Sequence, residues 1–305
     1  MSTPEASTGP ASSRHLPWSG LLLALAGSIG FSGKAIIVKL AYRYGVDAVT
    51  LIMYRMLFAL PMFVALAWWA GRNRPALTRR DWRVVLGLGF CGYYLASYLD
   101  FAGLQYVSAS LERLILYLNP TLVMLLGVLL FRRRVGAAQL SALAVSYCGV
   151  LLVFGHEVTL MGANVALGAL LVFGSALSYA VYLVYSGEEV NRLGALRLTG
   201  LATSVACVLC IAQFALLRPL AALDVAPQVL WLSVLNATVC TFAPVVMVMM
   251  AIERIGATLA AQTGMVGPLS TILMGVLILG EPFTTWVAAG TALVLAGIWM
   301  LARRR

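Results

Sequence analysis

Long apolar segments separated by short polar connections run through the whole chain. Each is about 20 residues long, which is the length that an α-helix needs to cross a hydrocarbon core of about 30 Å. Lipid offers no hydrogen-bond partners, so each segment must satisfy its own backbone as a helix. The pattern predicts ten spanning helices, at about residues 18–40, 48–70, 83–105, 108–131, 138–155, 165–187, 198–217, 229–252, 257–279 and 284–302. The fold class that follows is an all-α integral membrane protein.

The first half of the chain recurs in the second half at a constant offset of 148 residues. Leu111–Leu129 lies over Leu259–Leu277, which places Pro120 over Pro268. Because each unit has an odd number of spans, the second copy must enter the membrane from the opposite side. Many secondary transporters are built from such inverted repeats. We predict two inverted five-helix repeats, with the domain ranges 18–155 and 165–302 after a disordered cytoplasmic N-terminus at 1–17.

The composition agrees with this fold class and narrows the partners of the chain. Of 305 residues, 62% are hydrophobic and only 10% are charged, whereas a soluble protein carries about 25% charged residues. The net charge of +10 could indicate binding to nucleic acid or another anion. The distribution of the positive charge argues against both partners. If the N-terminus is cytoplasmic, the only Lys and Arg residues in segments on the outer side are Lys39, Arg43 and Arg218. This bias predicts a multi-pass protein of a bacterial inner membrane, with both termini cytoplasmic and lipid headgroups near the basic segments.

Two prolines occupy matching positions inside the fourth and ninth predicted spans. A proline within a helix removes one donor and clashes with the carbonyl four residues earlier. Pro120 and Pro268 should therefore free the carbonyls of Leu116 and Gly264 near the membrane centre. Such interruptions can be tolerated kinks, but at equivalent positions of two repeats they point to a binding site. We predict that both prolines are hinges next to the substrate.

Five ionisable residues fall inside predicted spans. They come from four helices and share one depth, roughly 6–10 Å below the outer surface at about 1.5 Å per residue: Lys34, Arg55, Asp100, Glu112 and Arg113. A charge in hydrocarbon costs about 2.5–3.5 kcal/mol on insertion scales, so we expect a paired cluster with one cation in surplus. The cluster could be a structural network, an outer gate, or a site where the surplus cation binds a substrate carboxylate. Glu112 or Asp100 could instead carry a coupling proton.

Uncharged polar side chains lie on the same or facing helices. They are Tyr98, Tyr117, Asn119, Tyr179, Asn236 and Gln262. Aromatic stripes in membrane helices are often packing residues, whereas polar groups near the midplane can line a cavity. We predict that these six residues take part in substrate binding or gating together with the charged cluster.

The sequence predicts no catalytic residue, metal site or cofactor. Cys207 and Cys210 have CxxC spacing but lie on an apolar helix, where free cysteines usually act as small packing residues. A GxxxxGK[ST] loop for ATP is absent, so transport would use a gradient of protons or of the substrate. An enzyme acting on lipid-linked substrates would need a metal-binding carboxylate cluster or a nucleophile–base pair. A structural or sensory role is the other alternative.

Four short motifs are spread over nearly the whole chain. They are LIMYRMLFALP at 51–61, RRDW at 79–82, LGEPFT at 279–284, and the pair Gly290 and Gly297. Together with the two five-span repeats, they resemble the drug/metabolite transporter superfamily in its EamA-type ten-helix branch. The resemblance implies that helices one, three, four, six, eight and nine line a central cavity and that helices five and ten are peripheral.

One motif of this family is present in only one repeat. Gly280 and Glu281 align with Arg132 and Arg133, so the first repeat lacks the LGEP sequence. The resemblance is specific for fold and does not name a substrate. Our interpretation is a secondary transporter, not an enzyme, that exports a small amphipathic metabolite or drug, such as an amino acid, by alternating access.

Overall fold

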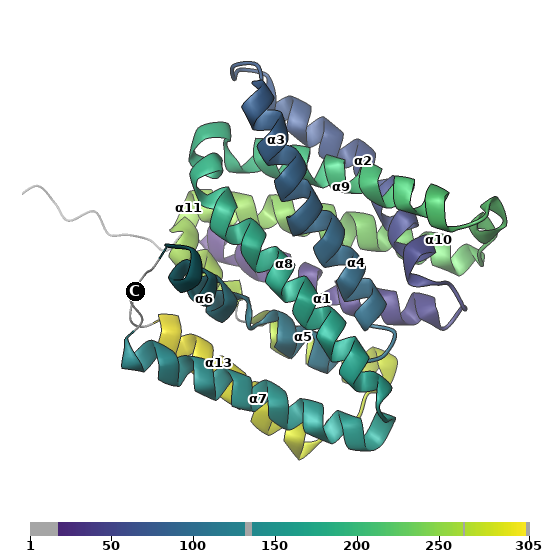
Figure 1. Cartoon of the computed structure of the whole chain (residues 1–305), viewed down its shortest axis with the longest axis vertical. Helices are drawn as coiled ribbons and strands as arrows, with labels where there is room; N and C mark the ends of the chain where they lie inside the picture. The colour runs from purple at the N-terminus through teal and green to yellow at the C-terminus, as the bar shows by residue number, and fades with distance from the viewer. Residues whose placement is uncertain (1–17, 132–135, 265, 303–305) are drawn as a thin grey trace, which may run out of the picture.

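The computed structural model describes residues 18–131, 136–264 and 266–302, and these residues are helical throughout with short connections (Figure 1). Eight helices in this part of the chain are long and apolar enough to cross a membrane, and Val266–Leu279 and Thr285–Met300 are two shorter apolar helices. The predicted all-α membrane fold with ten spans is therefore confirmed. The prediction of disorder at 1–17 lies outside the described residues.

The elements of the first half are α1 (Trp18–Tyr42), α2 (Ala48–Gly71), α3 (Arg79–Leu88), η1 (Gly89–Leu95), α4 (Ala96–Gly103), α5 (Ala109–Leu116), α6 (Asn119–Phe131) and α7 (Ala137–Met161). The elements of the second half are α8 (Asn164–Leu193), α9 (Ala195–Leu217), η2 (Leu220–Leu223), α10 (Pro227–Ala237), η3 (Thr238–Phe242), α11 (Ala243–Gly264), α12 (Val266–Met274), η4 (Gly275–Leu279) and α13 (Thr285–Ala302). Gly256 has a φ of 80° inside α11 and separates the eighth span from the ninth.

Short polar side chains begin several of these helices. The Asp47 carboxylate accepts hydrogen bonds from the backbone N–H groups of Val49 and Thr50 at the start of α2. Ser108 Oγ accepts from the backbone N–H of Leu111, at 2.9 Å, at the start of α5. These caps satisfy N–H groups that have no partner within the helix, so each span begins at a defined residue.

The inverted repeat is visible in close contacts that recur at the sequence offset. A Cβ atom on Gly20 would lie 2.4 Å from Ile255 Cγ2, and one on Gly168 would lie 2.8 Å from Val107 Cγ1. Gly20 and Gly168 are equivalent positions, and so are Ile255 and Val107. The contact of α1 with α11 therefore has its counterpart in the contact of α8 with the third span.

Irregular helix geometry also recurs. The third span contains the π-helical segment η1, and the eighth span contains η3 at the corresponding position. π-Helical turns are rare overall, but those that occur are often found at functional sites. The segments related by the repeat thus share a local widening of the helix in the middle of the membrane.

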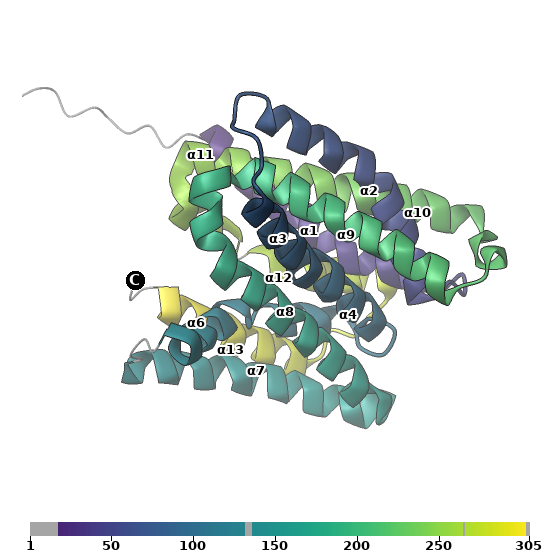
Figure 2. The same cartoon turned by 45° about the horizontal axis from the view of Figure 1, so that its top comes forward.

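Two apolar clusters lie on different sides of the bundle. One is built around α2 and α9, with Ile52 and Cys207 fully buried. The other joins α5, α7 and α13 through residues such as Leu114, Val153 and Val294. Figures 1 and 2 show α7 and α13 side by side at one edge of the molecule and α2 beside α9 at another.

We name the two ends of the bundle by their residues. The Glu281 face carries the connections at 43–47, 104–108 and 280–284. The basic face carries the connection at 72–78 and the kink at Gly256 inside α11.

α7 and α13 pack so closely at Gly149 that an added methyl group there should destabilise the protein. A Cβ atom on Gly149 would lie 2.6 Å from the carbonyl oxygen of Gly290, whereas one on Gly155 of the same helix would meet nothing within 4 Å. We expect Gly149→Ala to lower the free energy of unfolding by about 1–3 kcal/mol, because backbone must move. Gly155→Ala is the matched control and should leave thermal unfolding in detergent unchanged or slightly raise its midpoint. Equal midpoints for the two variants would contradict this packing.

Candidate functional site

A cavity of about 430 Å³ lies inside the bundle and is lined by both repeats. Its walls come from the first, third, fourth, sixth, eighth and ninth spans, as the resemblance implies. The second and seventh spans contribute as well, through residues such as Arg55 and Thr203. The lining residues include none from α7 or α13, which agrees with the peripheral place expected for the fifth and tenth spans.

Three of the five predicted charges form one compact ion-pair group. Lys34 Nζ on α1 lies 2.5 Å from Asp100 Oδ2 on α4 and 3.3 Å from Glu112 Oε1 on α5. Glu112 is completely buried, with an exposed fraction of 0%, and Asp100 is 2% exposed. One ammonium group thus neutralises part of the charge of two buried carboxylates, as an expensive intramembrane charge requires.

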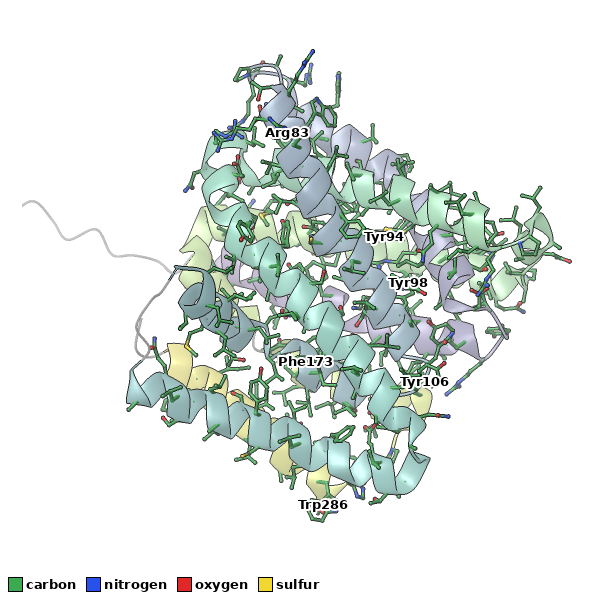
Figure 3. All side chains as sticks on the ribbon, viewed as in Figure 1. Arg83, Tyr94, Tyr98, Tyr106, Phe173 and Trp286 are labelled. Carbon is green, nitrogen blue, oxygen red and sulfur yellow. The ribbon has the colours of Figure 1, made fainter. Side chains whose placement is uncertain are left out.

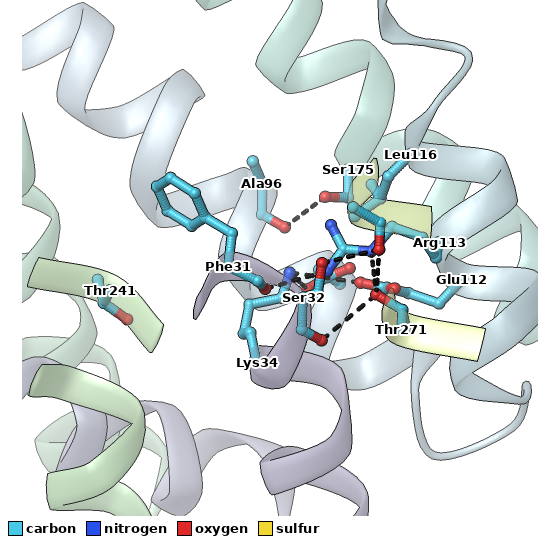
Figure 4. Close-up of polar contacts among 12 residues, drawn as sticks. Phe31, Ser32, Lys34, Ala96, Glu112, Arg113, Leu116, Ser175, Thr241 and Thr271 are labelled. Atoms are coloured by element: carbon cyan, nitrogen blue, oxygen red, sulfur yellow. Dashed lines mark hydrogen bonds and ion pairs between the residues drawn. The ribbon is translucent and has the colours of Figure 1, made fainter. Parts of the chain in front are cut away.

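The two arginines lie outside this ion-pair group. Arg113 donates from Nε to Thr271 Oγ1 at 2.9 Å and from Nη2 to the carbonyl oxygen of Phe31 at 3.0 Å. Figure 4 shows its guanidinium beside α1 and next to Thr271, close to Lys34 and Glu112. Arg55 donates from Nε to Thr241 Oγ1 at 3.1 Å.

Neither arginine has a carboxylate within 4.0 Å among the residues that the structure describes. We expected the five charges to pair with one cation left over. Instead, Lys34 alone contacts both carboxylates, and two cations are left without a carboxylate partner in the described part of the chain. Lys34 contacts both acids, so hydroxyl and carbonyl oxygens are the partners left for Arg55 and Arg113. Arg55 also stacks over the ring of Phe101, 5.2 Å from its centroid.

The fourth span is broken, so Pro120 does not lie in the middle of a helix. It is the second residue of α6, where a proline lacks no hydrogen bond that the helix needs. Asn119 Nδ2 donates to the carbonyl oxygen of Leu116 at 2.8 Å. This carbonyl is therefore not free, contrary to the sequence-based prediction.

The carbonyl freed by Pro268 is satisfied by the other repeat. Gly264 O accepts hydrogen bonds from Tyr117 Oη at 2.8 Å and from Ser28 Oγ at 2.9 Å. Ser32 Oγ donates to the carbonyl oxygen of Gly267 at 2.8 Å. Side chains of the first repeat thus supply hydrogen bonds to backbone carbonyls next to Pro268 at the cavity wall.

The remaining predicted residues divide between the cavity and its surroundings. Asn119 and Tyr179 line the cavity, and Tyr179 stacks on Tyr182 at 5.5 Å. Tyr98 and Asn236 are not among the lining residues. Tyr98 packs against the cluster of Met53 and Phe214 instead, on the side of α4 away from α8 (Figure 3). Asn236 is 1% exposed, and the side chain of Gln262 lies outside the described part of the chain.

The structure adds a second group of charged residues at the Glu281 face, which sequence reasoning missed. Glu281 Oε1 accepts from the backbone N–H of Ala109 at 2.7 Å, and Oε2 accepts from the Ser110 hydroxyl at 3.0 Å. Glu281 therefore binds the N-terminus of α5, where a helix favours negative charge. The LGEPFT motif was a signal for this residue, but its partner lies in the other repeat and could not be read from the motif.

Other contacts close the same face. Arg43 Nη2 donates to the carbonyl oxygen of Leu279 at 2.8 Å, and Lys39 Nζ donates to that of Val107 at 2.7 Å. Glu157 accepts from both the backbone N–H and the hydroxyl of Ser108. The contacts of Arg43 and Glu281 join one repeat to the other at this end of the bundle.

Removal of Lys34 should destabilise the protein strongly. Lys34→Met leaves Asp100 and Glu112 buried without their shared cation, and breaking a buried ion pair in this way costs about 3–5 kcal/mol. The triple change Lys34→Met with Asp100→Asn and Glu112→Gln removes the unpaired charges and should recover most of the loss. The measurement is the free energy of unfolding in mixed detergent micelles. A Lys34→Met protein as stable as the wild type would contradict the ion-pair group.

Comparisons with known proteins agree with this architecture. The EamA-like transporter family matches residues 18–155 and 166–303. The uncharacterized transporter YcbK of Bacillus subtilis is 32% identical over 272 residues, covering 86% of each chain. The uncharacterized transporter YetK of the same organism is 23% identical over 285 residues, covering 92% of this chain and 86% of its own.

A solved crystal structure shares the fold. It has a TM-score of 0.60 at 20% identity and covers 94% of this chain and 98% of its own. The two family matches together span most of the sequence, one on each side of the repeat boundary. The chain belongs to the EamA-like transporter family.

Proposed function

We propose that the chain is a secondary transporter that carries a small amphipathic solute by alternating access, with the 430 Å³ cavity as the substrate site. The observation that carries this proposal is the cavity itself, because both repeats line it and two buried arginines reach it. Its size lies in the usual range of small-molecule sites, about 300–1,000 Å³. Its walls include the interrupted helices at Asn119 and Gly267, as in transporters whose sites lie at broken helices.

The other two classes of function fit the geometry less well. A structural or sensory protein has no need of a cavity that holds buried cations. An enzyme for lipid-linked substrates would need carboxylates that are free to act, yet Asp100 and Glu112 both contact Lys34. Transport therefore accounts for more of the site.

The conformation supports export in which the solute enters the cavity from the basic face and leaves at the Glu281 face. Arg43 and Glu281 join the two repeats at the Glu281 face, whereas the cavity walls reach Thr199, close to the start of α9 on the basic face. If the arginine-rich connections are cytoplasmic, this arrangement faces inward. We propose a bacterial inner membrane protein with cytoplasmic termini that receives its solute from inside and releases it after the Glu281 face opens.

A proton is the coupling ion that the ion-pair group supports best. Glu112 is fully buried, and apart from the Lys34 contact neither of its carboxylate oxygens has a hydrogen-bond partner in the described part of the chain. Protonation of Glu112 would leave Lys34 with Asp100 alone and change the charge between α1, α4 and α5. The packing of three cavity helices would then depend on the proton.

The flux of solute across a sealed membrane tests the transport function. Proteoliposomes are loaded with a mixture of amino acids and small organic acids, and mass spectrometry follows their release. At least one solute should leave faster than from protein-free vesicles. Gly267→Leu should block this release, because a Cβ atom there would lie 2.6 Å from Tyr117 Oη in the cavity wall.

The control for that variant is Gly87→Leu. A Cβ atom on Gly87 would meet nothing within 4 Å, and Gly87 does not line the cavity. Release should match the wild type. If no solute leaves faster than from protein-free vesicles, the transport function is wrong.

Proton coupling has a separate test. Glu112→Gln should abolish uptake driven by a pH gradient, because an amide cannot take up and release a proton. Exchange of labelled for unlabelled solute at equal pH should continue, since the cavity remains. Retention of pH-driven uptake in the variant would exclude Glu112 as the proton carrier.

A further inference from the structure

We infer that the cavity is selective for organic monoanions, and that Arg55 binds the carboxylate of the solute through the free end of its guanidinium. This inference rests on the proposed transport function and names its substrate class. The chain of observations starts with Arg55 itself. It is only 7% exposed, and its Nε is the one nitrogen with a partner, Thr241 Oγ1.

The outer end of Arg55 has no partner among the described residues. Nη1 is buried without a hydrogen bond, and no hydrogen bond joins Nη2 to any described group. A guanidinium cannot be deprotonated in proteins, so burial leaves a full positive charge with two unpaired donors. Such a group is costly unless an anion completes it. The two terminal nitrogens form the planar fork that matches a carboxylate in two parallel hydrogen bonds.

No described side chain pairs directly with this end of Arg55. Asp100 is the carboxylate whose charge acts on Arg55, but it forms no ion pair with the guanidinium within 4.0 Å, and its Oδ2 binds Lys34. The other ionisable groups that face Arg55 are the thiols of Cys207, Cys210 and Cys240, which are buried. Phe101 offers only its ring face. The outer end of Arg55 is therefore left open to an anion from outside the chain.

Charge counting selects a monoanion. While Glu112 is ionised, Lys34, Arg55 and Arg113 carry three positive charges and Asp100 and Glu112 carry two negative charges, which leaves a surplus of one. One carboxylate brings the buried group to neutrality, whereas a phosphate ester with two charges would overshoot. Arg113 also lines the cavity and has Nη1 free of any hydrogen bond among the described residues, so it adds a second donor.

The cavity wall also carries an apolar patch, beside hydroxyl groups such as those of Ser97, Ser175 and Thr203. The patch consists of Met56, Phe63, Leu116, Val245, Val248 and Met249. These side chains cannot satisfy a second charge, but they can surround a hydrocarbon or aromatic tail. The cavity thus combines unpaired guanidinium groups with an apolar patch, and the solute we infer is a carboxylic acid with an apolar tail.

Matched acid and amide probes test the inference directly by binding. Purified wild-type protein is titrated with phenylpropionate and phenylpropionamide, and with hexanoate and hexanamide, by thermal shift and calorimetry. Each amide keeps the shape of its acid and lacks the charge. We expect the acids to bind about ten- to a hundredfold more tightly than their amides, as charge-assisted hydrogen bonds to a buried arginine imply.

The variants assign the preference to Arg55. Arg55→Gln should lower the acid preference to less than about threefold, and Arg55→Lys, which keeps the charge but not the fork, should retain only part of it. Arg218→Gln is the control, because it removes the same charge from a side chain that pairs with Asp47 on the Glu281 face. This control should keep the full preference.

Several results would overturn the inference. One is the absence of any acid-selective binding to the wild type. Another is an acid preference that persists in Arg55→Gln, or is lost equally in Arg218→Gln. Flux of the amides without flux of the acids would overturn the inference while leaving the transport function intact. Acid-selective binding with no flux of any solute would leave the carboxylate site standing and reject transport.

Discussion

A backbone carbonyl inside a membrane must find its hydrogen-bond donor within the protein, because lipid offers none. Much of this structure follows from that constraint. Pro268 releases the carbonyl of Gly264, and Tyr117 and Ser28 donate to it from the other repeat. The two repeats are thus linked at the cavity wall through a carbonyl that Pro268 cannot satisfy. These hydrogen bonds also position Tyr117 and Gly267 in the wall of the cavity.

The two repeats share a scaffold but not a charge distribution. Lys34, Arg55 and Glu112 align with Tyr182, Thr203 and Ala260, so the polar chemistry of the cavity comes mainly from the first repeat. The second repeat supplies Glu281, which binds the N-terminus of α5 at the Glu281 face. The first repeat therefore provides the intramembrane charges, and the second provides a carboxylate that joins the repeats at one end of the bundle. This division gives a symmetric fold two chemically different faces, as directional transport requires.

Sequence patterns predicted the fold well, because the length of each apolar segment and the constant repeat offset can both be read directly from the chain. They also found Lys34, Asp100 and Glu112, since charges inside spans are conspicuous. The sequence could not predict which residues pair. Arg55 donates a hydrogen bond to Thr241 of the other repeat, and Thr241 lies in the π-helical segment η3. Tyr98 was predicted on the cavity from its type and spacing, but side-chain direction depends on the packing of α4 against α2 and α9. The roles of the site residues in substrate binding and gating stay predictions, because only binding and flux measurements can test them.

The central claim is that Glu281 holds one end of the cavity shut while the other end is open. Its most direct test is a pair of spin-label distances in a background without the exposed Cys148. Labels at Gln105 and Phe283 report on the Glu281 face, and labels at Asn191 and Glu253 report on the basic face. Introducing Glu281→Gln should lengthen the first distance and shorten the second. Unchanged distances, or lengthening at both faces, would contradict the account.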